Sequence, residues 1–175
     1  PQYLEFTCDV YKREDGRNFI CSPPMKGKES QDALWKALKA GYIDTVATDH
    51  CPFQSYEKDW GKDDFTKVPN GCAGVENLYP YMLDAANSGK LSFERVVELC
   101  STNPAKIFGC ENKGSIAIGK DADIVILDPK KKWTMTKKKM YGAADYTCYE
   151  GREIEGKIDL VMQRGKILVK DGEFL

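Results

Sequence analysis

The segment Thr48-Asp49-His50-Cys51-Pro52 holds the residue types and the position best suited to chemistry. It follows a short β-branched run, residues 43–48, which predicts a buried strand of a parallel sheet. A carboxylate at the carboxyl end of such a strand, ahead of a long loop, occupies the place where α/β barrels carry catalytic groups. A lone aspartate there is also typical of a turn that its side chain caps, and spacing alone favours this structural interpretation.

His50 is the only histidine in the chain, and its neighbour Cys51 suggests a pair of metal ligands. Adjacent residues of a strand point to opposite faces, so Asp49 and His50 do not readily share one metal ion. We therefore expect His50 to pack or to support the site. The seven cysteines are irregularly spaced and form no CxxC pair, which indicates reduced thiols in a cytoplasmic protein.

The elements that must position these residues fall into two regions. Up to about residue 112 the pattern is α/β, with predicted helices at residues 29–42, 75–87, 92–100 and 103–108 and a loop of about 25 residues after the strand at 43–48. Gly41 and Gly109 are predicted to end the first and last of these helices, and Ser92 is a predicted N-cap. From residue 113 the pattern is β. It predicts a strand at 121–128 that ends at Pro129, then a hairpin whose strands, 159–162 and 166–169, meet at Arg164-Gly165.

Charge and hydropathy narrow the possible partners. With 26 basic and 27 acidic residues the net charge is -1, which argues against nucleic acid or an anionic membrane as the main partner. The lysine runs at 130–132 and 137–139 are typical of a solvated surface. No run approaches the ~20 apolar residues that span a bilayer.

Several segments resemble, in order and spacing, the dihydropyrimidinase/hydantoinase family of the amidohydrolase superfamily. They include Cys21-Ser22-Pro23-Pro24, Thr48 to Phe53 and Val68-Pro69-Asn70-Gly71, together with residues 1–4, 31–35, 64–67, 74–76, 101–109 and 113–125. The match covers essentially the whole chain. Ala73 departs from it, because many relatives carry proline there.

The resemblance implies an α/β fold class: the C-terminal part of a TIM-like (β/α)8 barrel over residues 1–112, and the C-terminal part of a small β-sandwich domain over residues 113–175. Residues 1–4 would end the seventh barrel strand and 44–49 would form the eighth. The family binds two zinc ions. Asp49 matches its metal-binding aspartate, which is also catalytic, because it takes a proton from the hydroxide that the zinc ions hold. Ser22 and Asn70 match substrate-binding positions that act through main-chain atoms.

The function that the resemblance implies is hydrolysis of the ring amide of hydantoins or dihydropyrimidines, small cyclic amides, by a hydroxide bound to two zinc ions. The family's remaining ligands are histidines and a carboxylated lysine on earlier strands, and this chain has one histidine in total. We therefore expect the 175-residue chain to be inactive by itself. Relatives are commonly homotetramers. The preferred cyclic amide stays open, because earlier loops select it.

Two alternatives come from the same superfamily. An allantoinase or a dihydroorotase would also open a ring, but Ser22-Pro23-Pro24 and Pro69-Asn70-Gly71 favour the hydantoinase interpretation. A non-catalytic scaffold relative of the collapsin response mediator type would lack the metal aspartate and the Pro-Asn-Gly segment. Asp49 and Asn70 are both present here, so the enzyme is the better supported interpretation.

Overall fold

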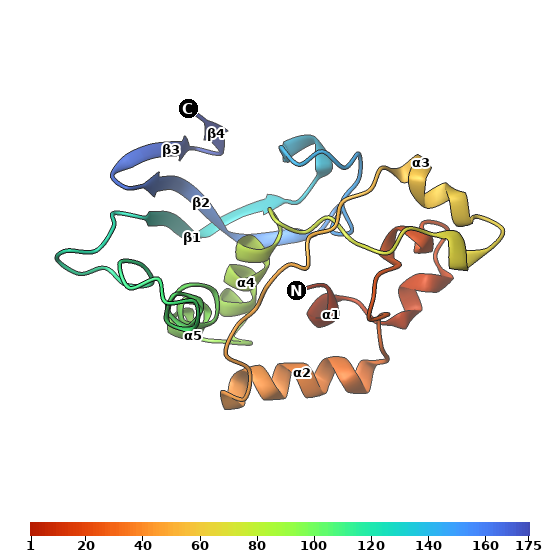
Figure 1. Ribbon diagram of the computed structural model, residues 1–175, viewed down its shortest axis with the longest axis horizontal. Coiled ribbons are helices and arrows are strands. Elements are labelled where there is room, and N and C mark those ends of the chain that lie inside the picture. Colours follow the sequence, from red (N-terminus) through yellow and green to blue (C-terminus); the bar gives the residue numbers. More distant parts are fainter. The chain divides into compact units, whose positions relative to one another are not determined.

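A computed structural model describes residues 1–175, with helices in the first part of the chain and strands in the last (Figure 1). The helices are α1 (Gln2–Glu5), α2 (Lys28–Ala40), α3 (Ser55–Lys58), α4 (Leu78–Asn87), α5 (Phe93–Val97) and α6 (Asn103–Ile107). The strands are β1 (Ile124–Thr134), β2 (Glu153–Gln163), β3 (Lys166–Lys170) and β4 (Glu173–Phe174). Short 3-10 turns occur at Cys8–Lys12, Gly16–Phe19, Asp59–Gly61, Phe65–Lys67 and Lys137–Lys139.

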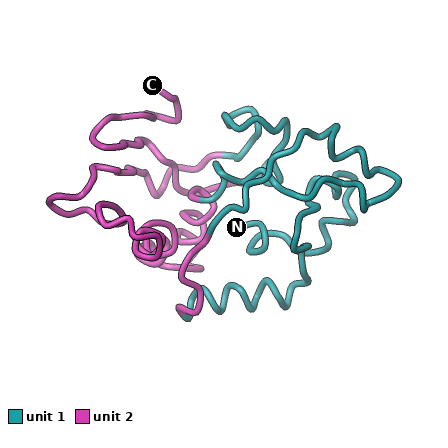
Figure 2. The backbone as a smooth tube through the Cα atoms, viewed as in Figure 1, with its two compact units in different colours: residues 1–40, 47–78, 134–152 teal, residues 41–46, 79–133, 153–175 magenta.

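The chain forms two units, drawn in different colours in Figure 2. Unit 1 comprises residues 1–40, 47–78 and 134–152, and unit 2 comprises residues 41–46, 79–133 and 153–175. Each unit has its own buried core. In unit 1 it includes Leu4, Phe19, Leu38, Val68 and Met135, and in unit 2 it includes Tyr81, Met82, Leu83, Val96, Leu99 and Ile154.

Helix α2 packs against α1 in unit 1 (Figure 1). It confirms the predicted helix at residues 29–42 with ends shifted by one or two residues. Gly41 follows the last helical residue with φ +81, the left-handed conformation in which glycine commonly ends a helix. On its inner face, the Trp35 indole Nε1 donates a hydrogen bond of 3.1 Å to the Leu4 carbonyl, which fixes α1 against it.

Residues 93–107 run through α5, a π-helical turn (Glu98–Thr102) and α6 without a break. The Ser92 side chain accepts a hydrogen bond from the Arg95 amide, so the predicted N-cap is confirmed. The widened turn lies just before Pro104, which has no N–H to donate and whose ring clashes with the carbonyl four residues back. Gly109, with φ +66, then ends the helix as predicted.

The sheet of unit 2 has the strand order β1-β2-β3-β4. Strands β2 and β3 pair antiparallel and meet at Arg164-Gly165, with φ values of +48 and +80, the conformation of a two-residue hairpin turn. The predicted hairpin is therefore confirmed. The prediction that the strand at 121–128 ends at Pro129 is wrong, because β1 continues to Thr134. Proline is tolerated there because β1 is an edge strand, with a neighbour on one side only.

The strand predicted at residues 43–48 is not formed in this chain. Residues 42–49 carry no regular structure, and the sole ladder contact nearby is an isolated parallel bridge between His50 and Cys72. A strand requires a neighbour that exchanges hydrogen bonds along its length. Here the Val46 amide instead donates to the Leu99 carbonyl over 3.2 Å. The long loop that follows is also more structured than expected, since it contains α3 and two 3-10 turns.

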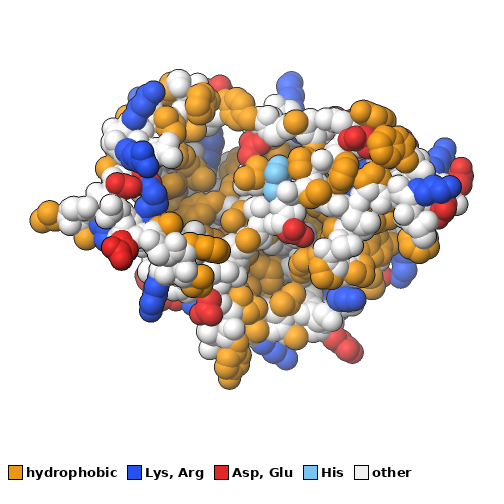
Figure 3. All heavy atoms as spheres, viewed as in Figure 1, with side chains coloured by type: hydrophobic (Ala, Val, Ile, Leu, Met, Phe, Trp, Pro, Cys, Tyr) orange, Lys and Arg blue, Asp and Glu red, His pale blue; other side chains and the backbone are white.

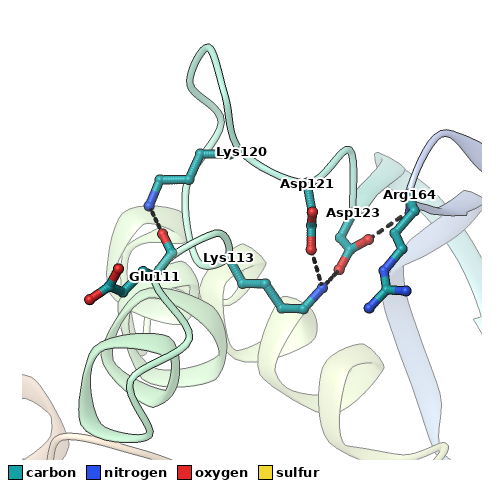
Figure 4. A network of polar contacts seen from close by, with 6 residues as sticks. All are labelled: Glu111, Lys113, Lys120, Asp121, Asp123 and Arg164. Carbon is teal, nitrogen blue, oxygen red and sulfur yellow. Dashed lines mark hydrogen bonds and ion pairs between the residues drawn. The ribbon is translucent and has the colours of Figure 1, made fainter.

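A polar network holds the loop between α6 and β1 in unit 2 (Figure 4). The Lys113 ammonium forms ion pairs with Asp121, at 2.9 Å, and with Asp123. These contacts raise the pKa of Lys113, with the Asp123 hydrogen bond as the largest cause. The Asp123 carboxylate also accepts a hydrogen bond of 2.8 Å from the Arg164 amide. The network therefore ties the loop to the turn of the β2–β3 hairpin.

The surface agrees with the near-zero net charge. Acidic and basic side chains are interspersed among hydrophobic ones on the face shown in Figure 3, with no large area of one sign. The structure contains no helix with the length and apolar character needed to cross a bilayer.

Candidate active site

The segments that carry the three predicted site residues run side by side in unit 1. The Cys51 amide donates to the Cys72 carbonyl over 3.1 Å, and the Gly71 amide donates to the Ile20 carbonyl over 3.0 Å. The first bond joins the segment that follows Asp49 to the segment that follows Asn70. The second bond joins the segment that follows Asn70 to the segment that precedes Ser22. Glycine is required at 71, because a Cβ there would lie 2.6 Å from the Cys51 carbonyl oxygen.

Ser22 and Asn70 meet directly. The Ser22 hydroxyl donates a hydrogen bond of 3.2 Å to the Asn70 Oδ1, across 48 positions of sequence. Both residues are exposed, and the peptide between Ser22 and Pro23 is cis. The structure therefore brings together two residues that the sequence linked only through the family resemblance.

Both residues line a cavity of about 970 Å³ that lies within unit 1. This volume is at the upper end of the range that holds a small ligand, roughly 300–1,000 Å³. Apolar and aromatic groups form part of its wall, including Tyr11, Ile20, Phe65 and Val68. An ion pair between Arg17 and Asp59 forms a polar part of the wall. Glu14 and Lys62 also line the cavity, which thus combines apolar surface with several polar groups that could orient a small ligand.

Asp49 is exposed and makes no hydrogen bond or ion pair, so its carboxylate is available to a ligand. Its backbone has φ +50, in the left-handed region that few residues other than glycine occupy. Aspartate is one of the few residues other than glycine that tolerate this conformation. This geometry distinguishes Asp49 from an ordinary turn aspartate, whose side chain would hydrogen-bond the neighbouring backbone.

His50 has the supporting role expected from the sequence. Its Nδ1 accepts hydrogen bonds from the Gly74 amide at 3.0 Å and from the Val75 amide at 3.2 Å. A neutral imidazole that accepts at Nδ1 carries its proton on Nε2, so neither nitrogen has a lone pair free for a metal. His50 thus orders the chain from residue 73 to 75.

Two of the buried thiols, Cys21 and Cys72, are disfavoured as metal ligands. A hydrogen bond with Cys148, together with burial, raises the pKa of Cys72 to about 12. A hydrogen bond with Cys72 and burial also raise the pKa of Cys21. Metals bind the thiolate, and a raised pKa disfavours it.

No group of three or more histidine, cysteine, aspartate or glutamate residues is arranged to hold a metal ion. Zinc in proteins takes three or four such ligands. Asp49 offers one open carboxylate of the right chemistry. The chain could therefore supply one ligand to a metal site, but it does not contain a complete metal site.

Two residues at this site were missed by the sequence reasoning. The Tyr3 hydroxyl donates a hydrogen bond of 2.7 Å to the Pro23 carbonyl, beside Ser22. Burial is the largest cause of a raised pKa of Tyr3, and the Asp49 carboxylate adds to it. Lys58, the last residue of α3, is completely buried, and it contacts the segment that carries Ser22 and the segment that carries Asn70. Neither a tyrosine in a helical turn nor a lysine in a polar loop carries a sequence signal for such a place.

Comparison with known proteins gives consistent results. A model of the amidohydrolase family matches residues 6–168. The D-hydantoinase of Rhizobium radiobacter is 40% identical over 99% of this chain and 39% of its own length. The crystal structure of dihydropyrimidinase from Brevibacillus agri NCHU1002 aligns with a TM-score of 0.96 at 38% identity, over 100% of this chain and 39% of that one.

A structure described as L-hydantoinase (dihydropyrimidinase) from Arthrobacter aurescens aligns almost as well, with a TM-score of 0.94 at 36% identity over 100% of this chain and 39% of that one. The chain thus spans about 39% of the length of the relatives it matches.

Proposed function

Since the chain belongs to the amidohydrolase family, we propose that a full-length protein of its relatives' size hydrolyses the ring amide of hydantoins or dihydropyrimidines. In this proposal residues 1–112 complete a (β/α)8 barrel and residues 113–175 contribute to a β-sandwich. Residues 43–48, which form no strand in this chain, would form the eighth barrel strand once neighbouring strands are present. Seven free cysteines support a cytoplasmic location, and a homotetramer is part of the same proposal.

The observation that carries the proposal is the meeting of Ser22 and Asn70 at the cavity wall. A cyclic amide presents alternating C=O and N–H groups along a planar edge. Main-chain donors and acceptors at two adjoining rigid turns match such an edge. Ser22 and Asn70 would bind the ring in this way and hold its scissile amide in a fixed position.

Asp49 would serve as metal ligand and as the group that moves the proton. Zinc, when bound, lowers the pKa of water to near 7 and so supplies a nucleophile at neutral pH. The carboxylate of Asp49 would take the proton of that water and deliver it to the leaving nitrogen of the opened ring. Its freedom from other hydrogen bonds supports this role, because a carboxylate committed to the fold could not exchange protons readily.

We expect the full-length protein to open the rings of hydantoin and dihydrouracil, to lose that activity on treatment with a chelator and to regain it with zinc. Loss of ultraviolet absorbance by the ring amide measures the rate. A protein that opens dihydroorotate or allantoin but neither of these rings would be the alternative ring opener. A zinc-loaded protein that opens no ring would instead be a scaffold relative.

Ser22→Ala is expected to have a mild effect in the full-length protein. The change leaves the main-chain atoms of residue 22 in place and removes one exposed hydrogen bond to Asn70, worth about 1 kcal/mol or roughly fivefold in KM at most. Steady-state kinetics with hydantoin measures it. A fall in kcat as large as that of an Asp49 variant would mean that the hydroxyl takes part in the chemistry.

A further inference from the structure

The side chain of Lys58 is completely buried in unit 1, with 0% of its surface exposed. Its Nζ donates hydrogen bonds to three main-chain carbonyls: Ile20 at 3.0 Å, Pro69 at 2.6 Å and Gly71 at 2.7 Å. A protonated lysine has three N–H donors and no acceptor, so every donor is used. The face of the Phe53 ring, 5.3 Å from Nζ, adds a favourable cation–π contact.

Lysine is rarely buried without a carboxylate partner, yet the hydrogen bonds of Lys58 all go to main-chain carbonyls. Burial lowers its pKa, which reflects the cost of placing the charge there. The three carbonyls offset part of this cost only while the amine is protonated, because a neutral amine has two N–H donors. A buried group of this cost, held by backbone alone, points to a role beyond the stability of the fold.

The three carbonyls belong to the two turns that carry the proposed substrate-binding residues. Ile20 lies two residues before Ser22, while Pro69 and Gly71 lie on either side of Asn70. One ammonium group therefore contacts both turns at once. Three other polar links join the two segments: the Gly71 amide to the Ile20 carbonyl, the exposed side-chain bond between Ser22 and Asn70, and a hydrogen bond between the Cys21 and Cys72 thiols.

We propose that Lys58 is a positioning residue that sets the spacing of the Ser22 and Asn70 turns, and thereby aligns their main-chain groups with the edge of a cyclic amide. The proposal rests on the proposed function for its catalytic consequence. Lys58 does not touch the substrate, because its donors are all committed and its side chain is sealed from the cavity. Its effect is on substrate binding, through the geometry of backbone groups.

The test compares Lys58→Met, Lys58→Arg and the control Lys39→Met in the full-length protein. Methionine keeps the unbranched apolar stem and removes the charge and the donors. Arginine keeps the charge, but its planar fork cannot direct three N–H groups at three carbonyls around one atom. Lys39 is an exposed residue of α2, so the same lysine-to-methionine change there removes a charge without removing a buried contact.

We expect Lys58→Met to raise KM for hydantoin by about tenfold or more, since misaligned turns weaken at least two hydrogen bonds to the ring, each worth roughly fivefold in binding. The kcat of the folded enzyme should stay within about threefold, because no reacting group is lost. Lys58→Arg should lie between wild type and Lys58→Met. Lys39→Met should match wild type. An unchanged KM in both Lys58 variants would overturn the proposal.

Hydrogen exchange gives a readout that does not depend on activity. The amides of Cys51 and Gly71 should exchange faster in the Lys58 variants, while amides of α2 keep their wild-type rates. An equal rise in both regions would mean a purely global stabilising role and would overturn the proposal. If Lys58→Met does not fold, Lys58→Arg supplies both measurements. If the wild-type protein opens no ring, the proposed function fails, and the exchange data still decide whether Lys58 spaces the two turns.

Discussion

Asp49→Ala in the full-length protein is expected to lose nearly all ring-opening activity while the protein stays folded. A group that acts in the transition state typically contributes several kcal/mol, so the fall in kcat should be on the order of a thousandfold. The fold should survive, because the exposed Asp49 side chain makes no contact that the substitution would remove, and the left-handed backbone costs alanine about 1–2 kcal/mol. Kinetics with hydantoin and dihydrouracil, alongside circular dichroism, measures both effects.

Two further variants show whether the loss of activity comes from the charge of Asp49 and is specific to that position. Asp49→Asn keeps a side chain that tolerates the left-handed conformation and removes the negative charge, so it should be as inactive as Asp49→Ala. Asp63→Ala changes another exposed aspartate of the following loop and should keep wild-type activity. An Asp49→Ala protein that retains most of its turnover would show that Asp49 is an ordinary turn residue.

The 175-residue chain by itself is expected to be catalytically inactive and to hold no zinc pair. A two-zinc site requires several ligands in fixed geometry, and the chain offers Asp49 without a cluster around it. Elemental analysis of the purified chain after dialysis, together with a ring-opening assay, tests this. Two tightly held zinc ions for each chain, or measurable hydrolysis, would contradict the assignment of the missing ligands to other parts of the full-length protein.

The same chain is expected to self-associate. Tyr56, Trp60 and Phe65 are 62–76% exposed along one loop of unit 1, and residues 43–48 have no strand to pair with. Exposed aromatic groups and unpaired strand segments both favour association with another chain. Light scattering provides the measurement, with the full-length protein as the control that should show a single defined size.

Local signals in the sequence were sufficient for elements that depend on few neighbours. The Ser92 cap, the Gly41 and Gly109 stops and the Arg164-Gly165 turn each depend on residues within one turn of the chain, and all are present. The strand end at Pro129 failed, because whether a proline ends a strand depends on its place in the sheet. That place is a property of the whole fold, which no local pattern carries.

The candidate site was less accessible to sequence reasoning. Ser22 and Asn70 were linked through the family resemblance, since nothing local predicts a contact across 48 positions. Lys58 was missed because a lysine among polar loop residues has the pattern of a solvated side chain. Its three acceptors are backbone carbonyls, which every residue has, so residue type could not reveal them.

The left-handed backbone at Asp49 also restricts which sequences this position can explore. Most side chains pay about 1–2 kcal/mol there before any question of chemistry arises, whereas glycine, asparagine and aspartate do not. Of those three, aspartate alone carries an ionisable group. A drift to glutamate would keep the acid but meet the conformational cost and lengthen the side chain. The backbone conformation thus limits the substitutions that this position tolerates, and aspartate is the acidic residue that it favours.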